Sequence, residues 1–335
     1  TMEQKRLWKA VVAGDTARVT EIIDVHPHAL NWSQADGSTV LHHAARVGNS
    51  EMVRLLLLSG WAVDAQSRSG RRPIHEAASA GSSEVLSILL QSGAKTDCWK
   101  HNAWQPLHLA CVANQISAVE VLLQANADVG AKNRDGWSAL QLAAREGSAE
   151  IVSLLLTFGA EVNHRTSNGR TALHTASLHA HSAVVSALLA ASADPQGPDL
   201  SGVTPLHDAC STGHAEIVGQ LLASRADLES RDVVGQTPLH IAALSDATHV
   251  VTTLLEARCH PDPQDRSRCT DICRVRHPQG RHDATPRRSC AGQPRRCPTS
   301  YFRRRRRPGC IAHWTSSSGP GHLWEARHPQ RLTHA

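Results

Sequence analysis

A period of 33 residues runs through residues 34–262 of this chain of 335 residues. Glycines recur at this spacing or at its double, and Ala103 fills the single gap. Similar words surround these positions, among them DGSTVLHHAA, DGWSALQLAA, SGVTPLHDAC and VGQTPLHIAA. A repeat of about 20–50 residues is typical of solenoids, in which each unit buries its apolar face against its neighbours. The period therefore predicts an elongated array of stacked units.

The order of residues within one unit predicts two short helices joined by tight turns. Asp-x-Gly or Asn-Gly makes a turn in which Gly supplies a positive φ. Thr then caps the first helix, and Pro fits its first helical position. Ala-Ala keeps this helix thin enough for the next unit to pack closely. A Leu-rich second helix follows, as in MVRLLLLSG and EIVSLLLTFG.

With these words the chain resembles the ankyrin-repeat proteins over about residues 3–262. The resemblance implies an all-α solenoid of helix-turn-helix-loop units. It also implies a non-enzymatic scaffold or adaptor that binds a partner protein on its concave face. Residues 3–33 lack the TPLH-like word, and we interpret them as an N-terminal capping repeat. We expect seven ankyrin repeats over residues 34–262, and we number them from their first residues: 34, 67, 100, 133, 166, 199 and 232.

The formal net charge of +5 averages two unlike segments. Residues 1–262 carry 19 Lys or Arg and 26 Asp or Glu, a net charge of −7. Residues 263–335 carry 16 Arg and 4 acidic residues, a net charge of +12. The repeat register is lost after about residue 268, and no amphipathic pattern follows. We expect residues 263–335 to be a disordered tail rich in Arg, Pro and Cys, either genuine or the product of a frameshift that replaced further repeats.

The sequence shows no stretch with the roughly 20 apolar residues that a membrane span needs. The first residues turn polar before a signal-like segment develops, and nine Cys do not suggest a disulfide framework. We therefore expect a monomeric protein of the cytoplasm, with the nucleus as the alternative, and no membrane partner. Because the chain opens with Thr1 rather than Met, we also expect a fragment or an imperfect gene model.

The 22 His suggest catalysis or metal binding, but the pattern favours a structural role. Six of them share one repeat position, where we expect each ring to bond the backbone of the adjacent loop: His42, His75, His108, His174, His207 and His240. No nucleophile, phosphate-binding or dinucleotide motif is present, so we predict no enzyme and no cofactor. Cys269, Cys273, His277 and His282 are too closely spaced for a zinc finger, and we predict no metal.

The candidate binding residues are those that break the repeat consensus at the turn tips and on the first helices. These positions are basic and aromatic in repeats 2–5 although residues 1–262 are net acidic. They are Arg68, Arg71, Lys100, His101, Trp104, Lys132, Arg134, Trp137, Arg145, Arg165 and Arg170. Trp and Arg dominate many interface hot spots, so we predict an acidic partner anchored on Trp104 and Trp137. The alternatives are that these two rings stack on each other, and that the basic stripe binds RNA.

A closer resemblance covers residues 71–147, where RRPIHEAASAG, TDCWKHNAW and KNRDGWSALQLAAREG are similar to the family of ankyrin repeat domain-containing protein 16. That resemblance implies alanyl-tRNA synthetase as the partner, with Lys100 and Lys132 capturing misactivated serine in support of editing. The next finger carries Arg165 instead of Lys. A guanidinium stays protonated and is a poor acyl acceptor.

Overall fold

The computed structural model of the protein describes residues 2–26 and 32–259. The chain divides into the units Thr1–Arg266 and Ser267–Ala335, and the predicted tail over 263–335 lies outside the described residues. Within the first unit the described elements are helical. They are α1 Met2–Ala13, α2 Thr16–Val25, α3 Val40–Val47, α4 Ser50–Leu58, α5 Pro73–Ala80, α6 Ser83–Gln91, η2 His101–Ala103, α7 Pro106–Val112, α8 Ile116–Gln124, α9 Ala139–Glu146, α10 Ala149–Thr157, α11 Ala172–Leu178, α12 Ser182–Ala190, α13 Pro205–Thr212, α14 Ala215–Ala223, α15 Pro238–Leu244 and α16 Thr248–Cys259.

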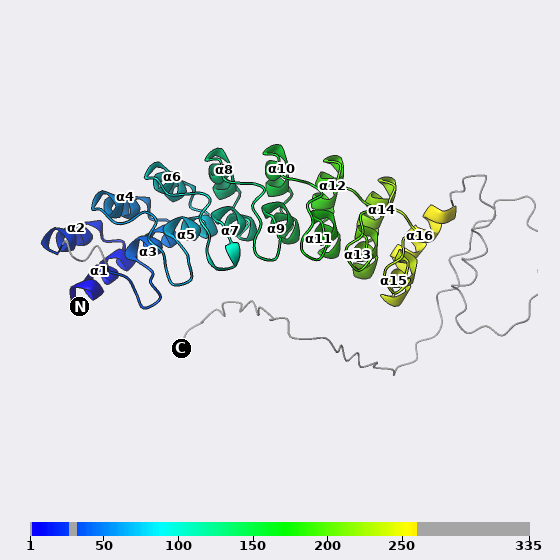
Figure 1. Cartoon of the computed structure of the whole chain (residues 1–335), viewed down its shortest axis with the longest axis horizontal. Helices are drawn as coiled ribbons and strands as arrows, with labels where there is room; N and C mark the ends of the chain where they lie inside the picture. Colours follow the sequence, from blue (N-terminus) through cyan, green and yellow to red (C-terminus); the bar gives the residue numbers. More distant parts are fainter. Residues whose placement is uncertain (1, 27–31, 260–335) are drawn as a thin grey trace, which may run out of the picture. The chain divides into compact units, whose positions relative to one another are not determined.

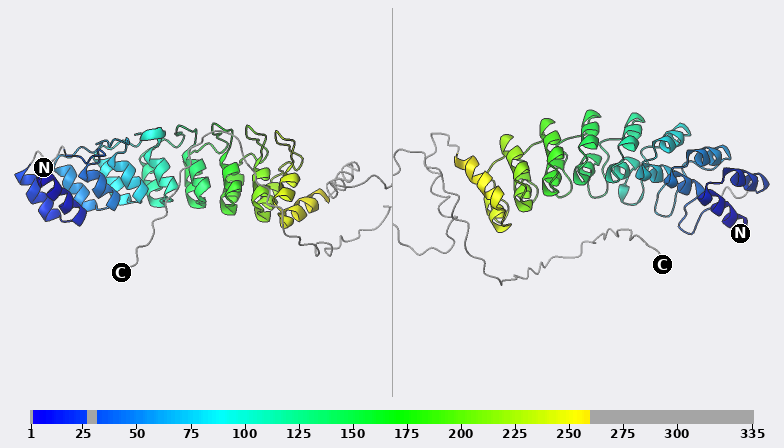
Figure 2. Two further views of the ribbon diagram at one scale, coloured as in Figure 1. Left: turned by 90° about the horizontal axis from the view of Figure 1, so that it is seen from below. Right: turned by 180° about the vertical axis from the view of Figure 1, so that it is seen from behind.

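The helices stand in two rows, which Figure 1 shows as an arched array with the odd-numbered helices on its concave side. We call α3, α5, α7, α9, α11, α13 and α15 the inner helices and their partners the outer helices. Each inner helix packs against the next inner helix, and each outer helix packs against the next outer one. The loops that enter the inner helices project beyond them in a line (Figure 2), and we call these loops fingers. The predicted all-α array of paired helices is confirmed.

Helix α13 shows why the repeated word folds as it does. The Thr204 N–H donates to His207 Nδ1 at 3.1 Å, and Pro205 occupies the first helical position, where no N–H partner is needed. The helix ends at Gly213, whose φ of 77° is left-handed and suits only Gly without strain. The finger Gly202 also has a positive φ, 74°, as the turn signal predicted.

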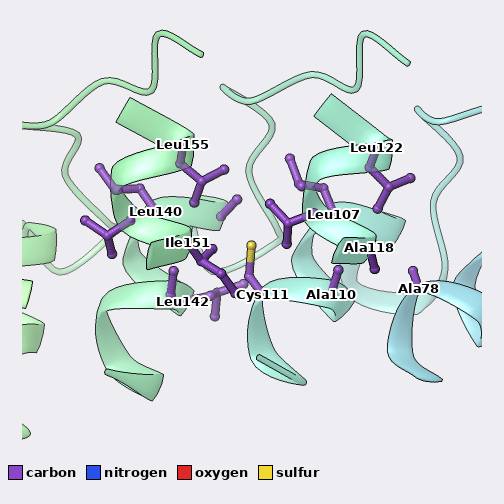
Figure 3. Packing of buried hydrophobic residues seen from close by; sticks show 14 of the residues in the cluster. Ala78, Leu107, Ala110, Cys111, Ala118, Leu122, Leu140, Leu142, Ile151 and Leu155 are labelled. Atoms are coloured by element: carbon purple, nitrogen blue, oxygen red, sulfur yellow. The ribbon is translucent and has the colours of Figure 1, made fainter. Parts of the chain in front are cut away.

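The core lies between successive repeats rather than in one central cluster. Figure 3 shows Leu107, Ala110 and Cys111 of α7 among side chains of the neighbouring helices, including Leu142 and Ile151. All five are at most 1% exposed. Burying a side chain such as Leu107 contributes about 2 kcal/mol, and the small Ala110 lets adjacent inner helices approach closely.

The two ends of the described array differ from its middle. At the N-terminal end, the Trp8 ring lies 5.6 Å from the Trp32 ring and 5.0 Å from the His43 ring, between centroids. At the other end, His240 and Ala243 of α15 are exposed, whereas residues at these two positions in the preceding repeats are buried. The covering of an inner helix is therefore supplied by the next repeat.

Candidate functional site: the basic and aromatic fingers

The fingers are held by two sets of backbone hydrogen bonds. Each finger is closed on itself, as where the Lys100 N–H donates to the Trp104 carbonyl at 3.0 Å. From the second finger on, each is also joined to the preceding finger by one backbone N–H, which donates to a carbonyl 32 residues earlier in the chain. These ladder bonds are Arg68 to Asp36, His101 to Ser69, Arg134 to Asn102, Ser167 to Asp135, Leu200 to Asn168 and Val233 to Ser201, at 2.8–3.4 Å. The candidate side chains are thereby presented at fixed spacing.

The third finger departs from the others because Ala103 stands where they have Gly. Ala103 has a φ of 59° and Asn102 a φ of 65°, so two residues with side chains adopt the left-handed conformation in the short helix η2. This conformation is unfavourable for Ala by about 1 kcal/mol. The strained turn ends at Trp104, directly before the buried Gln105 that precedes α7.

Trp104 is half-buried against the core and forms the centre of a small cluster. Its ring lies edge-on to His108, with 6.1 Å between centroids. Lys100 Nζ lies 5.2 Å from the Trp104 ring centroid, within the range of a cation–π interaction. Burial, with the nearby Arg71 guanidinium as a second cause, lowers the pKa of the Lys100 ammonium below its usual range.

Trp137 is also half-buried, but its partner comes from an inner helix. The guanidinium of Arg145 on α9 lies 5.8 Å from the Trp137 ring centroid and also pairs with Glu146 at 2.7 Å. Among the described residues, the rings of Trp104 and Trp137 do not contact each other. Each Trp is thus fixed within its own repeat, which disfavours the alternative of a stacked pair.

Besides Arg145, three more of the candidate arginines are committed to groups of the array itself. Arg71 Nη1 donates to Glu76 Oε1 at 2.9 Å. Arg165 Nη1 donates to the Pro198 carbonyl at 2.7 Å. Because these donors already have acceptors, they have less capacity to bind an external anion.

Arg170 is the most constrained of the three. It binds Asp208 on α13 and also lies 3.4 Å from Asp199 Oδ2. Asp208 is 5% exposed, and burial raises the pKa of its carboxyl to about 6, although the Arg170 guanidinium acts against this rise. Sequence reasoning missed Glu76 and Asp208, which share one repeat position on the inner helices and could have been found by reading that position across the repeats.

The remaining cations are free in the described part of the chain. Arg68, Lys132 and Arg134 are exposed, and their side chains have no ion pair or hydrogen bond to another described residue. His101 lies beside them and bonds the Arg68 carbonyl through Nε2 at 2.8 Å. Arg68, Lys132 and Arg134, together with Lys100 on the Trp104 ring, place positive charge on three adjacent fingers, around Trp104 and Trp137.

Five of the six repeated histidines have the structural role predicted for them, whereas the exposed His240 bonds only Thr237 at the start of its own helix. In His42, Nδ1 accepts from the Thr39 N–H and Nε2 donates to the Arg71 carbonyl at 3.0 Å. The rings of His75, His174 and His207 likewise bond a carbonyl in the next repeat, whereas His108 bonds the Ala131 carbonyl at the end of its own repeat. Burial lowers the pKa of His75, His108 and His174 to about 4, so these rings are neutral at pH 7. Gln141 replaces His in the fourth repeat and donates to the Arg170 carbonyl at 2.9 Å.

Three of the described cysteines are structural. Cys98, Cys111 and Cys210 are free and buried, and burial raises the pKa of the Cys98 and Cys210 thiols to about 12. No group of three or more His, Cys, Asp or Glu with metal-binding geometry occurs within residues 2–26 and 32–259. Cys269, Cys273, His277 and His282 lie outside these residues. In the same described part, no helix is both long and apolar enough to cross a bilayer.

The geometry defines a class of protein, a helical repeat array with projecting fingers, and comparisons with known proteins give the family. A family model described as "Ankyrin repeats (3 copies)" matches residues 7–101, 62–133, 107–199 and 192–265. The chain belongs to the ankyrin-repeat family. It is similar to the crystal structure of the human ASB11 ankyrin repeat domain, with 25% identity and a TM-score of 0.61 over 65% of this chain and 97% of that one. No curated protein matches the sequence.

Proposed function

We propose that this protein is an interaction scaffold that binds an acidic segment of a partner protein on the concave side of repeats 2–5. Ankyrin repeats are generally protein–protein interaction modules, and the site supplies the selectivity. One observation carries the proposal: Arg68, Lys132 and Arg134 are exposed and unpaired beside the half-buried Trp104 and Trp137. A carboxylate bound there would gain ionic contacts without breaking existing ones. The eleven candidate residues thus divide into a set whose side chains are free and a set whose side chains support the array.

A charge-reversal variant of the full chain tests this proposal. Arg68→Glu with Arg134→Glu removes two free cations, and its matched control is Arg18→Glu with Arg225→Glu, on exposed positions of α2 and the loop after α14. Binding of a fluorescent peptide rich in Glu is measured by anisotropy at several salt concentrations. We expect the first variant to bind about a hundredfold more weakly and the control to bind like the parent protein. Equal binding by both variants would contradict the proposal.

A second candidate function rests on Lys100, whose ammonium has a lowered pKa and lies against Trp104. An amine that loses its proton more readily is a better nucleophile. In this role the protein is a co-regulator of alanyl-tRNA synthetase editing, as the closer resemblance over residues 71–147 implies. The Lys100 or Lys132 nitrogen would attack the carbonyl of seryl-adenylate, form an amide, release AMP and give up a proton to water.

Labelled serine distinguishes the two candidates. The protein is incubated with alanyl-tRNA synthetase, ATP and labelled serine, and the modified lysines are mapped by mass spectrometry. Label on Lys100 or Lys132 that disappears in Lys100→Arg and Lys132→Arg would support the editing role. An unlabelled protein that still binds the acidic peptide would leave the scaffold as the function, acting in the cytoplasm or the nucleus.

A further inference from the structure

Seven residues at one repeat position form a line along the fingertips, and we call them the finger row. The finger row consists of Ala35, Arg68, His101, Arg134, Ser167, Leu200 and Val233. All seven are exposed. From Arg68 onward, each backbone N–H makes the ladder bond to the preceding finger, so these side chains leave the array at equivalent points.

The chemistry of the finger row changes along its length. Arg68 and Arg134 make it basic in repeats 2–4, with the polar His101 between them. Leu200 and Val233, 75% and 74% exposed, make it apolar in repeats 6 and 7. The neighbouring tip residue Val234 is 76% exposed and extends the apolar end. Large apolar side chains grouped on adjacent fingertips contribute little to folding and are typical of a surface that a partner covers.

We infer that the finger row binds one extended peptide segment, which is acidic where it crosses repeats 2–4 and apolar where it crosses repeats 6 and 7. The inference rests on the proposed function for the basic end. It adds a second contact, at the apolar end, and fixes the order in which the acidic and apolar parts of the ligand lie along the fingers. Charge complementarity fixes the acidic part of the ligand. The exposed Leu200 and Val233 determine the apolar part, because transferring their side chains from water to an apolar surface of the ligand is favourable.

The spacing of the two ends sets the length of the ligand. Packed helices are about 10 Å apart, so the two repeats between Arg134 and Leu200 span about 20 Å. Ser167, which lies between them, is small and uncharged and leaves room for any connecting residues. A flexible linker of about twelve residues has an average end-to-end distance of about 20 Å and would join the two contacts.

A second copy of this chain does not fit the finger row. A parallel pair would place arginines against arginines. An antiparallel pair would place the cations of one copy against Leu200 and Val233 of the other, where they would lose water without gaining a carboxylate. A ligand that carries acidic and apolar residues satisfies both ends.

Synthetic peptides test the inference on the full chain. The bipartite probe has a Glu-rich block, a linker of about twelve Gly and Ser residues, and a block of Leu and Ile. Its comparison probes are the Glu-rich block alone, the apolar block alone, and a bipartite peptide with a two-residue linker. Fluorescence anisotropy gives the dissociation constants, and sedimentation of the protein with and without peptide reports any self-association.

We expect the bipartite probe to bind about tenfold more tightly than the Glu-rich block, and the short-linker probe to lose this gain. Leu200→Asp with Val233→Asp should reduce the bipartite probe to the affinity of the Glu-rich block and leave the latter unchanged. Leu58→Asp is the matched control, because Leu58 is 88% exposed at the end of the outer helix α4.

The outcomes separate this inference from the proposed function. If the Glu-rich block and the bipartite probe bind equally, the apolar contact is wrong and the acidic-partner scaffold stands. If neither binds, both are wrong. Dimerisation abolished by Leu200→Asp with Val233→Asp would assign the apolar end to a second copy. An RNA oligonucleotide and the bipartite probe can each compete with the Glu-rich block for the protein. If the RNA displaces the block at the lower concentration, the basic end binds nucleic acid. Either result overturns the inference.

Discussion

The fingers of repeats 2–4 and those of repeats 6 and 7 have the same backbone and opposite surface chemistry. Both sets are closed by an internal hydrogen bond and joined by the ladder bonds. The first set presents free Arg68 and Arg134, whereas the second presents Leu200 and Val233. The comparison shows that the repeat consensus specifies the scaffold and leaves the tip residues to determine binding.

The boundary between the two sets lies at the fifth finger. A substitution there should have the largest effect on the stability of the array. Gly169 has a φ of 78°, and a Cβ at this position would lie 3.0 Å from the Leu200 nitrogen. Gly169→Val therefore combines a strained backbone with a clash against the sixth finger. We expect a loss of about 4 kcal/mol in the free energy of unfolding, measured with urea.

Gly159→Val separates these two causes. Gly159 has a φ of 86°, but nothing lies within 4 Å of its ideal Cβ. This variant should lose only about 1–2 kcal/mol. Equal losses for the two variants would mean that the contact between adjacent fingers contributes little.

Asp208 should make the stability of the sixth repeat depend on pH. Burial raises the pKa of its carboxyl to about 6 in the folded chain, from the 3.8 of an exposed Asp. Between these values the unfolded chain binds fewer protons, so this group's contribution falls as the pH rises from 4 to 6 and is constant above that range. Between pH 4 and pH 6 the contribution of Asp208 to the free energy of unfolding falls by about 3 kcal/mol.

Urea unfolding of the parent chain and of Asp208→Asn at a series of pH values measures this contribution. The free energy of unfolding of the parent minus that of the variant should decrease between pH 4 and pH 6. Parallel profiles for the two proteins would show that Asp208 titrates normally.

Trp104 should contribute more to the binding of an acidic peptide by the basic fingers than any apolar tip residue does. Trp104→Ala removes the ring that Lys100 contacts, and we expect the Glu-rich peptide to bind with about 2 kcal/mol less free energy. Circular dichroism checks that helicity is retained. If helicity falls together with binding, the ring acts through packing. Val234→Ala is the comparison at the other end of the fingers and should leave this peptide's affinity unchanged.

The smallest expected effect concerns the strained third finger. Ala103→Gly restores the residue found at this position in the other fingers and relieves a φ of 59°. We expect a gain of about 0.5–1 kcal/mol in the free energy of unfolding. Ala113→Gly is the control, because Ala113 has a φ of −79° and gains nothing from Gly. A loss of stability in Ala103→Gly would show that this turn is not strained.

Much of the fold followed from local sequence signals. The period of 33, the turn glycines, the Pro at the first helical position and the role of His42 and its equivalents all depend on contacts within a repeat or with the next one. Those contacts recur, so one repeat predicts the others. The N-terminal cap over residues 3–33 and the limits of the seven repeats stay predictions.

The candidate site was only partly predictable because its residues differ from repeat to repeat. The eleven positions were identified from the sequence, but not their partners. Arg71 and Arg170 were expected to face a ligand together with Arg134, yet they pair with Glu76 and with Asp208. Asp208 lies 38 residues from Arg170, and no local rule connects them.

The sequence by itself determined the class of fold, since a stacked unit of 33 residues with capped helices has few ways to bury its apolar face. It also determined which residues stand on the fingers. Only the tertiary structure decided which cations are free, because pairing depends on the distance between side chains of adjacent repeats. It likewise decided that Leu200 and Val233 are exposed side by side, because the ladder bonds bring equivalent positions of successive fingers together.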